Sequence, residues 1–599
     1  MNLAANSSTV PPAGPAPLAT SYDEVPYPRL AFSYTHPSHL ATIGRLLGLR
    51  PAPVDRCRVL ELGCAGGSNL VPMAYGLPGS MFVGIDLAER QIADGRTFVA
   101  DLGLKNVVLE QMDICAAAET LARRFEPFDY IIAHGIYSWV SDAVKDALLA
   151  ACRRLLAPQG IAYVSYNCYP GGYLREITRQ MCLYHSRGES DPRAFAAKNR
   201  AFLESLLKML PAGDDPYRAT VREQAANLLA ERDSIMLHDV LERDNDSQLL
   251  HEFLADAASH RLQYLGDAHF SNMLGIGIDS AGLEQLRRHG GVVDFQQQLD
   301  FLYGRGLATT LLCRDELTVE HRLVPEAVRD LWIASSAVAV SSDGDNGWTA
   351  CRIDALKLED ASPITFRTDE CRISIAHRVG KAAMLELCAA QPKPLRFDEF
   401  AERVERRLSL APPPPRANAV PPAANNPSLA EQLARMVIRW FGIHLVELSA
   451  FAPPLATEIA AQPVASAVAR YQVAKGWSIS EMAPSETSLP SAAMGDKVAH
   501  QVTNLFHRRI NFGGELVARV LLELDGRHDL AAIVDSLAAK VLSGEVMLQS
   551  AGPHVTDAAE VRRILSRRVE DCIADLARSA LLIRPESEFA RHELCSARS

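Results

Sequence analysis

The stretch Arg58-Val59-Leu60-Glu61-Leu62-Gly63-Cys64-Ala65-Gly66-Gly67-Ser68-Asn69 decides the fold of this chain. A short apolar run that contains one acid and ends in a small-residue loop is typical of a buried strand that turns sharply into a helix. Nineteen residues after Gly67, a second apolar run over 81–85 ends in Asp86. Two such units predict a doubly wound α/β domain that binds a nucleotide at the carboxyl ends of adjacent parallel strands.

The position of Glu61 distinguishes two kinds of nucleotide site. Dinucleotide-binding enzymes usually have a third glycine, which lets a helix N-terminus face a pyrophosphate, and no acid before the loop. Here the acid precedes the glycines. A carboxylate at this position would repel phosphate but would suit the amino group of a methionine moiety. The sequence therefore predicts S-adenosylmethionine rather than NAD as the cofactor.

The composition narrows the class of protein. The 599 residues are 48% apolar and 22% charged, which is typical of a soluble globular protein of roughly two to four domains. The net charge of −11 argues against nucleic-acid binding, because phosphate neutralisation needs clustered Lys and Arg. We find no apolar stretch of about 18 residues and expect no membrane insertion. The first residues resemble no secretory signal, and the twelve cysteines form no Cys-x-x-Cys pair, so we expect a cytoplasmic location and no metal site.

Beyond residue 58 the pattern alternates regularly between strands and helices. We predict strands at 58–62, 81–86, 107–112, 130–134 and 161–166, with helices between them, notably at 142–156. Such alternation predicts a parallel sheet with helices on both faces, which is a Rossmann-like α/β fold. After about residue 172 the alternation stops, and we expect mostly helical middle and C-terminal domains.

The glycines and Asp86 are the first candidates for cofactor contacts. Gly63 and Gly67 would let the backbone approach the methionine end of the cofactor without a Cβ clash. A tight turn without a ligand is the alternative interpretation. Asp86 could accept hydrogen bonds from the ribose hydroxyls, or it could cap the following helix.

The ends of the fourth and fifth predicted strands carry the candidates for catalysis. His134 reaches the floor of the site, where it could orient the cofactor, accept a proton or be a hydrogen-bonded core histidine. Methyl transfer is an in-line displacement, so alignment supplies most of the acceleration. An ammonium acceptor must first lose its proton, and tyrosine faces can hold its cationic form. The candidates are His134, Tyr137, Trp139, Tyr166 and Asn167, with Tyr169 beside them, and for each aromatic side chain the alternative is core packing.

These motifs resemble those of bacterial class I methyltransferases that carry a methyltransferase regulatory domain. The group includes the rickettsial-type lysine methyltransferases of outer-membrane proteins. The stretch 61–67 resembles the first motif of the class, Glu-x-Gly-x-Gly-x-Gly, with Ala65 in place of the middle glycine. The likeness continues at 134–139, 166–171, 238–239 and 300–305, and it is looser at 522–529. The residues Ala-His-Gly-Ile at 133–136 differ from the Asn/Asp-Pro-Pro-aromatic element of amino-DNA methyltransferases, which disfavours a DNA amine as acceptor.

The resemblance also implies roles for residues near the third strand. It implies that Asp113 accepts a hydrogen bond from the adenine amino group and that the backbone N–H of Ile114 meets the ring, whereas a loop aspartate is the alternative. The complete set of predicted cofactor contacts is Glu61, Gly63, Cys64, Ala65, Gly67, Asp86, Leu87, Asp113, Ile114 and His134.

The domain organisation follows from the pattern together with the resemblance. We predict, in chain order, a disordered N-terminus at 1–20; a methyltransferase domain at 21–172 in which 22–49 form a lid; a helical regulatory domain at 173–315; a mixed, winged-helix-like region at 316–410; a Pro/Ala-rich linker at 411–427; and a C-terminal domain at 428–599.

The resemblance implies S-adenosylmethionine-dependent methyl transfer to a protein, with a lysine side chain as the acceptor. It implies that the C-terminal domain aids substrate capture or oligomerisation, for which a homodimer is the expectation. Two alternatives stay open: a methyltransferase of small molecules or peptides, and a regulatory protein that binds the cofactor without transferring its methyl group. The sequence Leu307-Ala308-Thr309 departs from the family pattern in the region expected to govern substrate access.

Overall fold

The computed structural model of the chain describes residues 28–410, 427–479, 487–488, 499–546 and 557–584, apart from 212, 214, 243, 324, 343–347, 354–355, 357 and 359–361. The predicted disordered N-terminus and nearly all of the predicted linker lie outside the described residues, as do residues 22–27 of the predicted lid.

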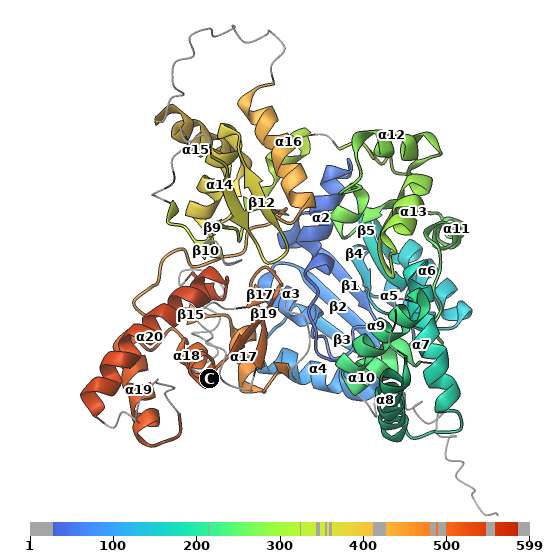
Figure 1. Cartoon of the computed structure of the whole chain (residues 1–599), viewed down its shortest axis with the longest axis horizontal. Coiled ribbons are helices and arrows are strands. Elements are labelled where there is room, and N and C mark those ends of the chain that lie inside the picture. The colour runs from blue at the N-terminus through green and yellow to red at the C-terminus, as the bar shows by residue number, and fades with distance from the viewer. Residues whose placement is uncertain are drawn as a thin grey trace, which may run out of the picture.

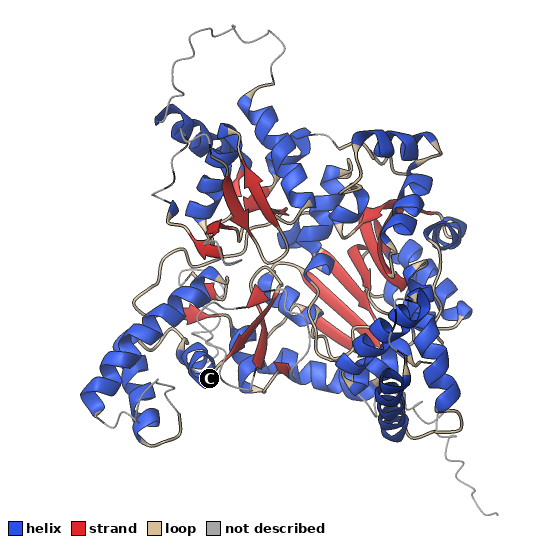
Figure 2. Cartoon of the chain, viewed as in Figure 1, coloured by secondary structure: helices blue, strands red, loops and turns tan. Residues whose placement is uncertain are grey.

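A seven-stranded sheet forms the centre of the N-terminal half, with helices on both of its faces (Figures 1 and 2). Its strand order is β3-β2-β1-β4-β5-β7-β6. The five parallel strands are β1 (Arg58–Leu62), β2 (Met81–Asp86), β3 (Val107–Gln111), β4 (Phe128–Ala133) and β5 (Leu156–Asn167). The predicted Rossmann-like parallel sheet is therefore confirmed.

Two antiparallel strands complete the sheet beyond the predicted domain boundary. Strand β7 (Leu307–Arg314) pairs with β5, and β6 (Leu262–Asp267) pairs with β7. The boundary predicted at residue 172 therefore divides one sheet, and the region predicted as helical supplies two of its strands. Several consecutive helices separate β5 from β6, and two more separate β6 from β7, so the regular β/α alternation that located the first five strands did not indicate these two.

The two faces of the sheet have separate cores. Helices α2 (Pro37–Leu46), α3 (Leu70–Gly76) and α4 (Glu89–Asp101) cover one face, where Val59, Ile132 and Tyr163 are buried. Helices α5 (Ile114–Ala122), α6 (Asp142–Leu155) and α11 (Leu250–Ser259) cover the other face, where Leu60 and Tyr166 are buried. Because side chains alternate along a strand, this division decides which strand-end residues share a face.

Helices also fill the interval between β5 and β7. Helices α7 (Gly171–His185), α8 (Pro192–Met209), α9 (Pro216–Ala230) and α10 (Asp233–Ile235) precede α11, and α7 to α9 pack around a small core of their own. Helices α12 (Ser280–Arg288) and α13 (Val292–Tyr303) lie between β6 and β7 in the sequence.

A middle unit with its own core follows the sheet (Figure 1). Its four-stranded antiparallel sheet contains β9 (Val338–Ser342), β10 (Trp348–Ala350), β11 (Ile364–Arg367) and β12 (Arg372–Ile375). Strand β8 (Trp332–Ala334) pairs with β13 (Leu395–Arg396) and β14 (Glu447–Ser449). The helices of this unit are α14 (Arg378–Ala390), α15 (Phe397–Leu410) and α16 (Leu429–Gly442).

The C-terminal domain forms a further core and reaches back to the first sheet. Its described elements are β15 (Val464–Ala465), α17 (Ala467–Ala474), β16 (Ser478–Ile479), β17 (Thr487–Ser488), β18 (Ala499–Thr503), β19 (Arg509–Gly513), α18 (Glu515–Glu523), α19 (Leu530–Leu542), α20 (Ala558–Arg578) and β20 (Leu582–Ile583). The turn between β18 and β19 lies against the loop that follows β1, where His507 bonds to Asn69. Among the described residues, no helix is both long and apolar enough to cross a membrane.

Candidate active site

Glu61 is a buried acid on β1, one residue before the strand ends. It lies two residues after the buried Val59 and therefore points to the face that α2 and α3 cover. Its Oε1 accepts a hydrogen bond from Nδ2 of Asn69 at 2.7 Å, whereas Oε2 is buried without a hydrogen-bond partner among the described residues. Burial raises the pKa of Glu61 to about 8, and the charge of Asp86 also raises it, against the effect of the Asn69 bond. A buried oxygen without a donor fits the ammonium group of S-adenosylmethionine.

The loop after β1 keeps the backbone accessible beside Glu61. Gly63, Ala65 and Gly67 all have left-handed φ angles, of 74°, 48° and 70°. A Cβ atom on Gly63 would lie 2.2 Å from Cδ1 of Ile136, so this crowding and the left-handed φ both favour glycine there. Ala65 adopts this conformation in place of the expected glycine, and its N–H donates to Oδ2 of Asp86 at 2.8 Å.

Asp86 and Asp113 end neighbouring strands at the same edge of the sheet. Oδ1 of Asp86 accepts the N–H of Ala88 at 2.9 Å, which fixes the carboxylate beside the loop, where a ribose would lie. Asp113 is exposed and caps α5 by accepting the N–H of Cys115 at 2.8 Å. The adenine contacts predicted for Asp113 and Ile114 stay predictions, as does the contact of Leu87, whose side chain is exposed.

His134 lies on the same face of the sheet as Glu61. Its Nδ1 is 2.9 Å from the hydroxyl of Tyr163 and 3.1 Å from Oγ of Ser165, and its ring lies 3.9 Å from the ring of Phe32. Burial lowers the pKa of His134 to about 3, so the ring is neutral at physiological pH. A neutral, hydrogen-bonded imidazole here can orient a bound group but is a weak proton acceptor.

Tyr137 and Tyr166 do not lie in the site, contrary to the prediction. Both are buried on the opposite face of the sheet, where Tyr166 stacks on Phe253 at 4.2 Å and its hydroxyl is 3.3 Å from Oγ1 of Thr310. The hydroxyl of Tyr137 donates to Asp256 at 3.2 Å. Both side chains therefore correspond to the core-packing alternative.

The remaining predicted residues, Asn167, Trp139 and Cys64, differ in their burial and in their contacts. Asn167 ends β5, and its amide bonds to Arg175 at 3.1 Å and to Asn245 at 3.2 Å, which holds the strand to the regulatory region. Trp139 is half-buried, and its catalytic role stays a prediction. Cys64 is buried, which raises the pKa of its thiol well above the ordinary value and keeps it protonated.

Asn69 joins Glu61 to two distant segments, a role that the sequence did not indicate. Its Oδ1 accepts the N–H of Phe32 and the Nε2–H of His507, each at 2.9 Å. Asn69 belongs to the stretch that decides the fold, but its partners come from the N-terminal segment and the C-terminal domain. No spacing in the sequence relates these positions.

Residues 28–36 cover the loop after β1. Oγ of Ser68 donates to the carbonyl oxygen of Leu30 at 3.1 Å, and Arg29 lies 3.7 Å from the carboxylate of Asp94 and 5.4 Å from the ring of Trp477. This segment therefore lies between the cofactor loop and the C-terminal domain, and the lid role predicted for 22–49 stays a prediction.

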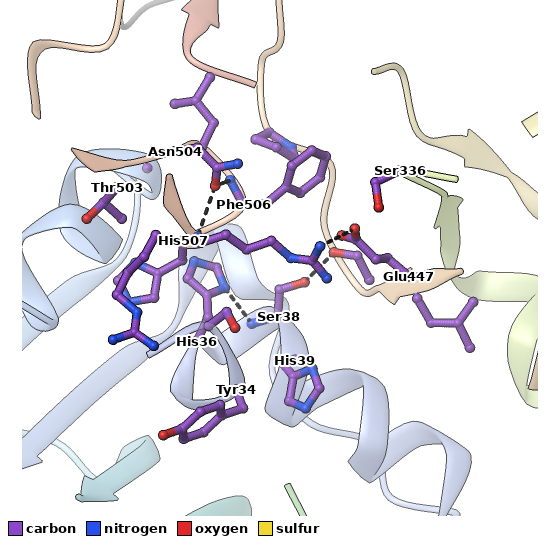
Figure 3. A pocket seen from close by; sticks show the side chains of 18 of the residues that line it. Tyr34, His36, Ser38, His39, Ser336, Glu447, Thr503, Asn504, Phe506 and His507 are labelled. Carbon is purple, nitrogen blue, oxygen red and sulfur yellow. Dashed lines mark hydrogen bonds and ion pairs between the residues drawn. The ribbon is translucent and has the colours of Figure 1, made fainter. Parts of the chain in front are cut away.

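A cavity of about 480 Å³ adjoins the site between the N-terminal segment, the middle unit and the C-terminal domain (Figure 3). Tyr34 lines it, and the Tyr34 ring lies 5.8 Å from the ring of His134. Burial lowers the pKa of His36 to about 3 and that of His39 to about 4, so both rings are neutral. The ionisable side chains of its wall are His36, His39, His269, His444, His507, Asp369, Glu370, Glu447, Arg508 and Arg509, with Tyr34 and Tyr75.

The fold and the site together define a class of enzyme. A Rossmann-like sheet is extended by antiparallel strands at one edge, an acid with an open oxygen precedes a glycine loop, and a second acid ends the next strand. This is the cofactor site of a class I methyltransferase.

Comparison with known proteins agrees with this class. Family models match at 53–206 (methyltransferase domain), 232–314 (predicted methyltransferase regulatory domain) and 487–581 (PKMT, C-terminal winged helix domain). The chain belongs to the bacterial class I S-adenosylmethionine-dependent methyltransferases that carry a methyltransferase regulatory domain, which confirms the predicted enzyme class and cofactor. The winged-helix match lies in the C-terminal domain, and the winged-helix-like unit predicted at 316–410 stays a prediction.

Two of the three relatives from Rickettsia described below cover more than nine-tenths of the chain. An uncharacterized protein of Rickettsia prowazekii is 28% identical over 568 residues, which are 94% of this chain and 93% of that protein. A second uncharacterized protein of the same organism is 37% identical over 237 residues, which are 40% of this chain and 93% of that protein. The structure of PKMT2 from Rickettsia typhi in complex with AdoHcy superposes with a TM-score of 0.76 at 26% identity and covers 93% of this chain and 100% of that chain.

Proposed function

We propose that this enzyme transfers the methyl group of S-adenosylmethionine to lysine side chains of a protein. The observation that carries the proposal is that the likeness to PKMT2, named as a protein lysine methyltransferase, extends over 93% of this chain. The matched regulatory region contributes His269 to the cavity beside the site, and the matched winged-helix region contributes His507. The acceptor would therefore meet parts of the chain that a bare methyltransferase domain lacks.

The side chains around the site suit this transfer. When bound, S-adenosylmethionine supplies an electrophilic methyl group. Glu61 would hold its ammonium, and Asp86 would hold its ribose. Tyr34 and the neutral His134 would line the approach of the acceptor, while residues 28–36 exclude water.

The cavity suits a lysine as the incoming group. The neutral imidazoles of His36 and His39 would not repel an ammonium. Glu370 on the wall would attract the basic residue and its neighbours, whereas Glu447 is already paired with Arg508 at 2.7 Å. Burial of the lysine would lower its pKa, which promotes the neutral amine that attacks the methyl carbon.

The test is incubation of the purified enzyme with radiolabelled S-adenosylmethionine and a whole bacterial extract. We expect label in discrete protein bands, recovered as methyl-lysine after hydrolysis and absent with Asp86→Ala. Label confined to small molecules would refute a protein acceptor and favour the small-molecule alternative. Label on another amino acid would refute lysine.

We infer that two copies of the chain associate through α7, α8 and α9. Large apolar side chains are exposed on these three helices, namely Tyr173, Leu174, Tyr184, Met209 and Tyr217. Light scattering of the full chain should give twice its mass of 65.3 kDa.

The cytoplasmic location stays a prediction.

A further inference from the structure

We propose that His507, in the C-terminal domain, is a positioning residue for methyl transfer. It holds the amide of Asn69, and Asn69 in turn holds the carboxylate of Glu61 that meets the ammonium of the cofactor. The proposal concerns cofactor binding and does not depend on which acceptor the enzyme methylates.

The amide of Asn69 uses all of its hydrogen-bonding capacity. Nδ2 donates to Oε1 of Glu61 at 2.7 Å and to Oγ1 of Thr35 at 3.1 Å. Thr35 is the acceptor of that bond because its own proton goes to the carbonyl oxygen of Phe32 at 2.8 Å. Oδ1 of Asn69 accepts from the N–H of Phe32 and from His507, each at 2.9 Å. A backbone N–H can only donate, so Phe32 fixes which end of the amide is the oxygen.

This orientation also fixes the protonation of His507. Its Nε2 faces an oxygen and must therefore carry a proton. Burial lowers the pKa of His507 well below the ordinary value, so the ring is neutral and donates through that one nitrogen. The turn that presents the ring is itself held by Asn504, whose Oδ1 accepts the N–H of Phe506 at 3.0 Å and that of Arg508 at 2.9 Å.

The same turn contacts the other side of the site. The guanidinium of Arg509 lies 5.9 Å from the ring of Phe32, and that ring lies 3.9 Å from the ring of His134. One turn of the C-terminal domain therefore supports both the carboxylate of Glu61 and the imidazole of His134. Loss of the His507 donor would leave Oδ1 of Asn69 with one partner and free the amide to rotate away from Glu61.

Two ligands separate this role from a general structural role. S-adenosylhomocysteine carries the ammonium that Glu61 would hold, whereas 5′-methylthioadenosine lacks the whole amino-acid part. We expect His507→Ala to weaken binding of S-adenosylhomocysteine about tenfold in calorimetry. We expect it to change the Kd of 5′-methylthioadenosine less than about twofold.

A matched pair of variants tests the donor itself. His507→Gln keeps a donor near the position of Nε2 and should bind S-adenosylhomocysteine almost as the native enzyme does. His507→Met has nearly the same size but offers no donor to Oδ1 of Asn69, so it should bind about as weakly as His507→Ala. This pair decides the matter if the alanine variant does not fold.

A control comes from the same hairpin. His500 lies on β18, half-buried, with its ring 5.5 Å from that of Phe512, and it lies outside the site. His500→Ala should leave both affinities unchanged. Equal weakening of both ligands by His507→Ala, unchanged binding of both, or equal binding by the glutamine and methionine variants would each overturn the proposal.

Discussion

Cofactor binding to this enzyme should release a proton at neutral pH, because Glu61 is protonated before the cofactor arrives. Burial raises the pKa of Glu61 to about 8, and its Oε2 has no donor among the described residues. An ammonium requires the ionised carboxylate as its partner. The bound ligand therefore displaces the proton that the buried acid carries in the free enzyme.

The size of the effect follows from that pKa. With a pKa of about 8, roughly 0.9 of the enzyme carries the proton at pH 7, so binding should release about 0.9 protons per ligand. Below about pH 8, each pH unit should weaken binding about tenfold, which is about 1.4 kcal/mol. Above it, the dependence on Glu61 should level off.

Calorimetry in two buffers of different ionisation enthalpy measures this release directly. At pH 7, the heat of S-adenosylhomocysteine binding should differ between phosphate and Tris. The difference should equal the number of released protons multiplied by the difference in ionisation enthalpy between the two buffers. The variant Glu61→Gln keeps the shape of the side chain but cannot titrate, so its weak binding should show no difference. Native heats that are independent of the buffer at pH 7 would refute the reasoning, as would an affinity that stays constant from pH 6 to pH 8.

Three further predictions concern single residues. The pKa of Glu61 is raised on folding, so its contribution to stability is present below about pH 4.5 and is lost as the pH rises toward about 8; Glu61→Gln should therefore raise the melting temperature of the cofactor-free enzyme at pH 8 but not at pH 4. Gly63→Ala should lower stability by about 1–3 kcal/mol, more than Gly135→Ala, because both positions have a left-handed φ but only the first would clash with Ile136; urea unfolding of the two variants compares them. Glu370→Gln should raise the KM for a protein acceptor in steady-state assays and leave the Kd of S-adenosylhomocysteine unchanged.

The sequence predicted those parts of the fold that obey a local rule. Strands β1 to β5 were found because each is an apolar run followed by a helix, and residues 58–62 and 81–86 were placed correctly to the residue. Strands β6 and β7 obey no such rule, since β7 pairs with β5 across about 140 residues and β6 then pairs with β7. Nothing in the composition of 262–267 or 307–314 indicates which edge of the central sheet these segments will join.

The predictions of the site residues show the same division between local motifs and long-range contacts. Glu61, Gly63 and Asp86 come from one motif, and their geometry follows from the turn between strand and helix. Tyr166 was placed in the site because it ends a strand, but its neighbours on β5 alternate between the two faces, and only pairing with β4 shows that Tyr163 is the residue beside His134. His507 lies 438 residues from Asn69, and no spacing rule spans that separation.

The order of the strands has a consequence for folding during synthesis on the ribosome. Strand β5 is complete at residue 167, but its partner β7 begins at residue 307, so about 140 further residues must leave the ribosome before that edge is covered. At about 5–20 residues per second, the backbone of 162–167 stays open for roughly 7–28 s. An open edge of this kind is a template for pairing with other nascent chains. A fragment that ends at residue 206, where the methyltransferase-domain match ends, would keep that edge permanently and should aggregate.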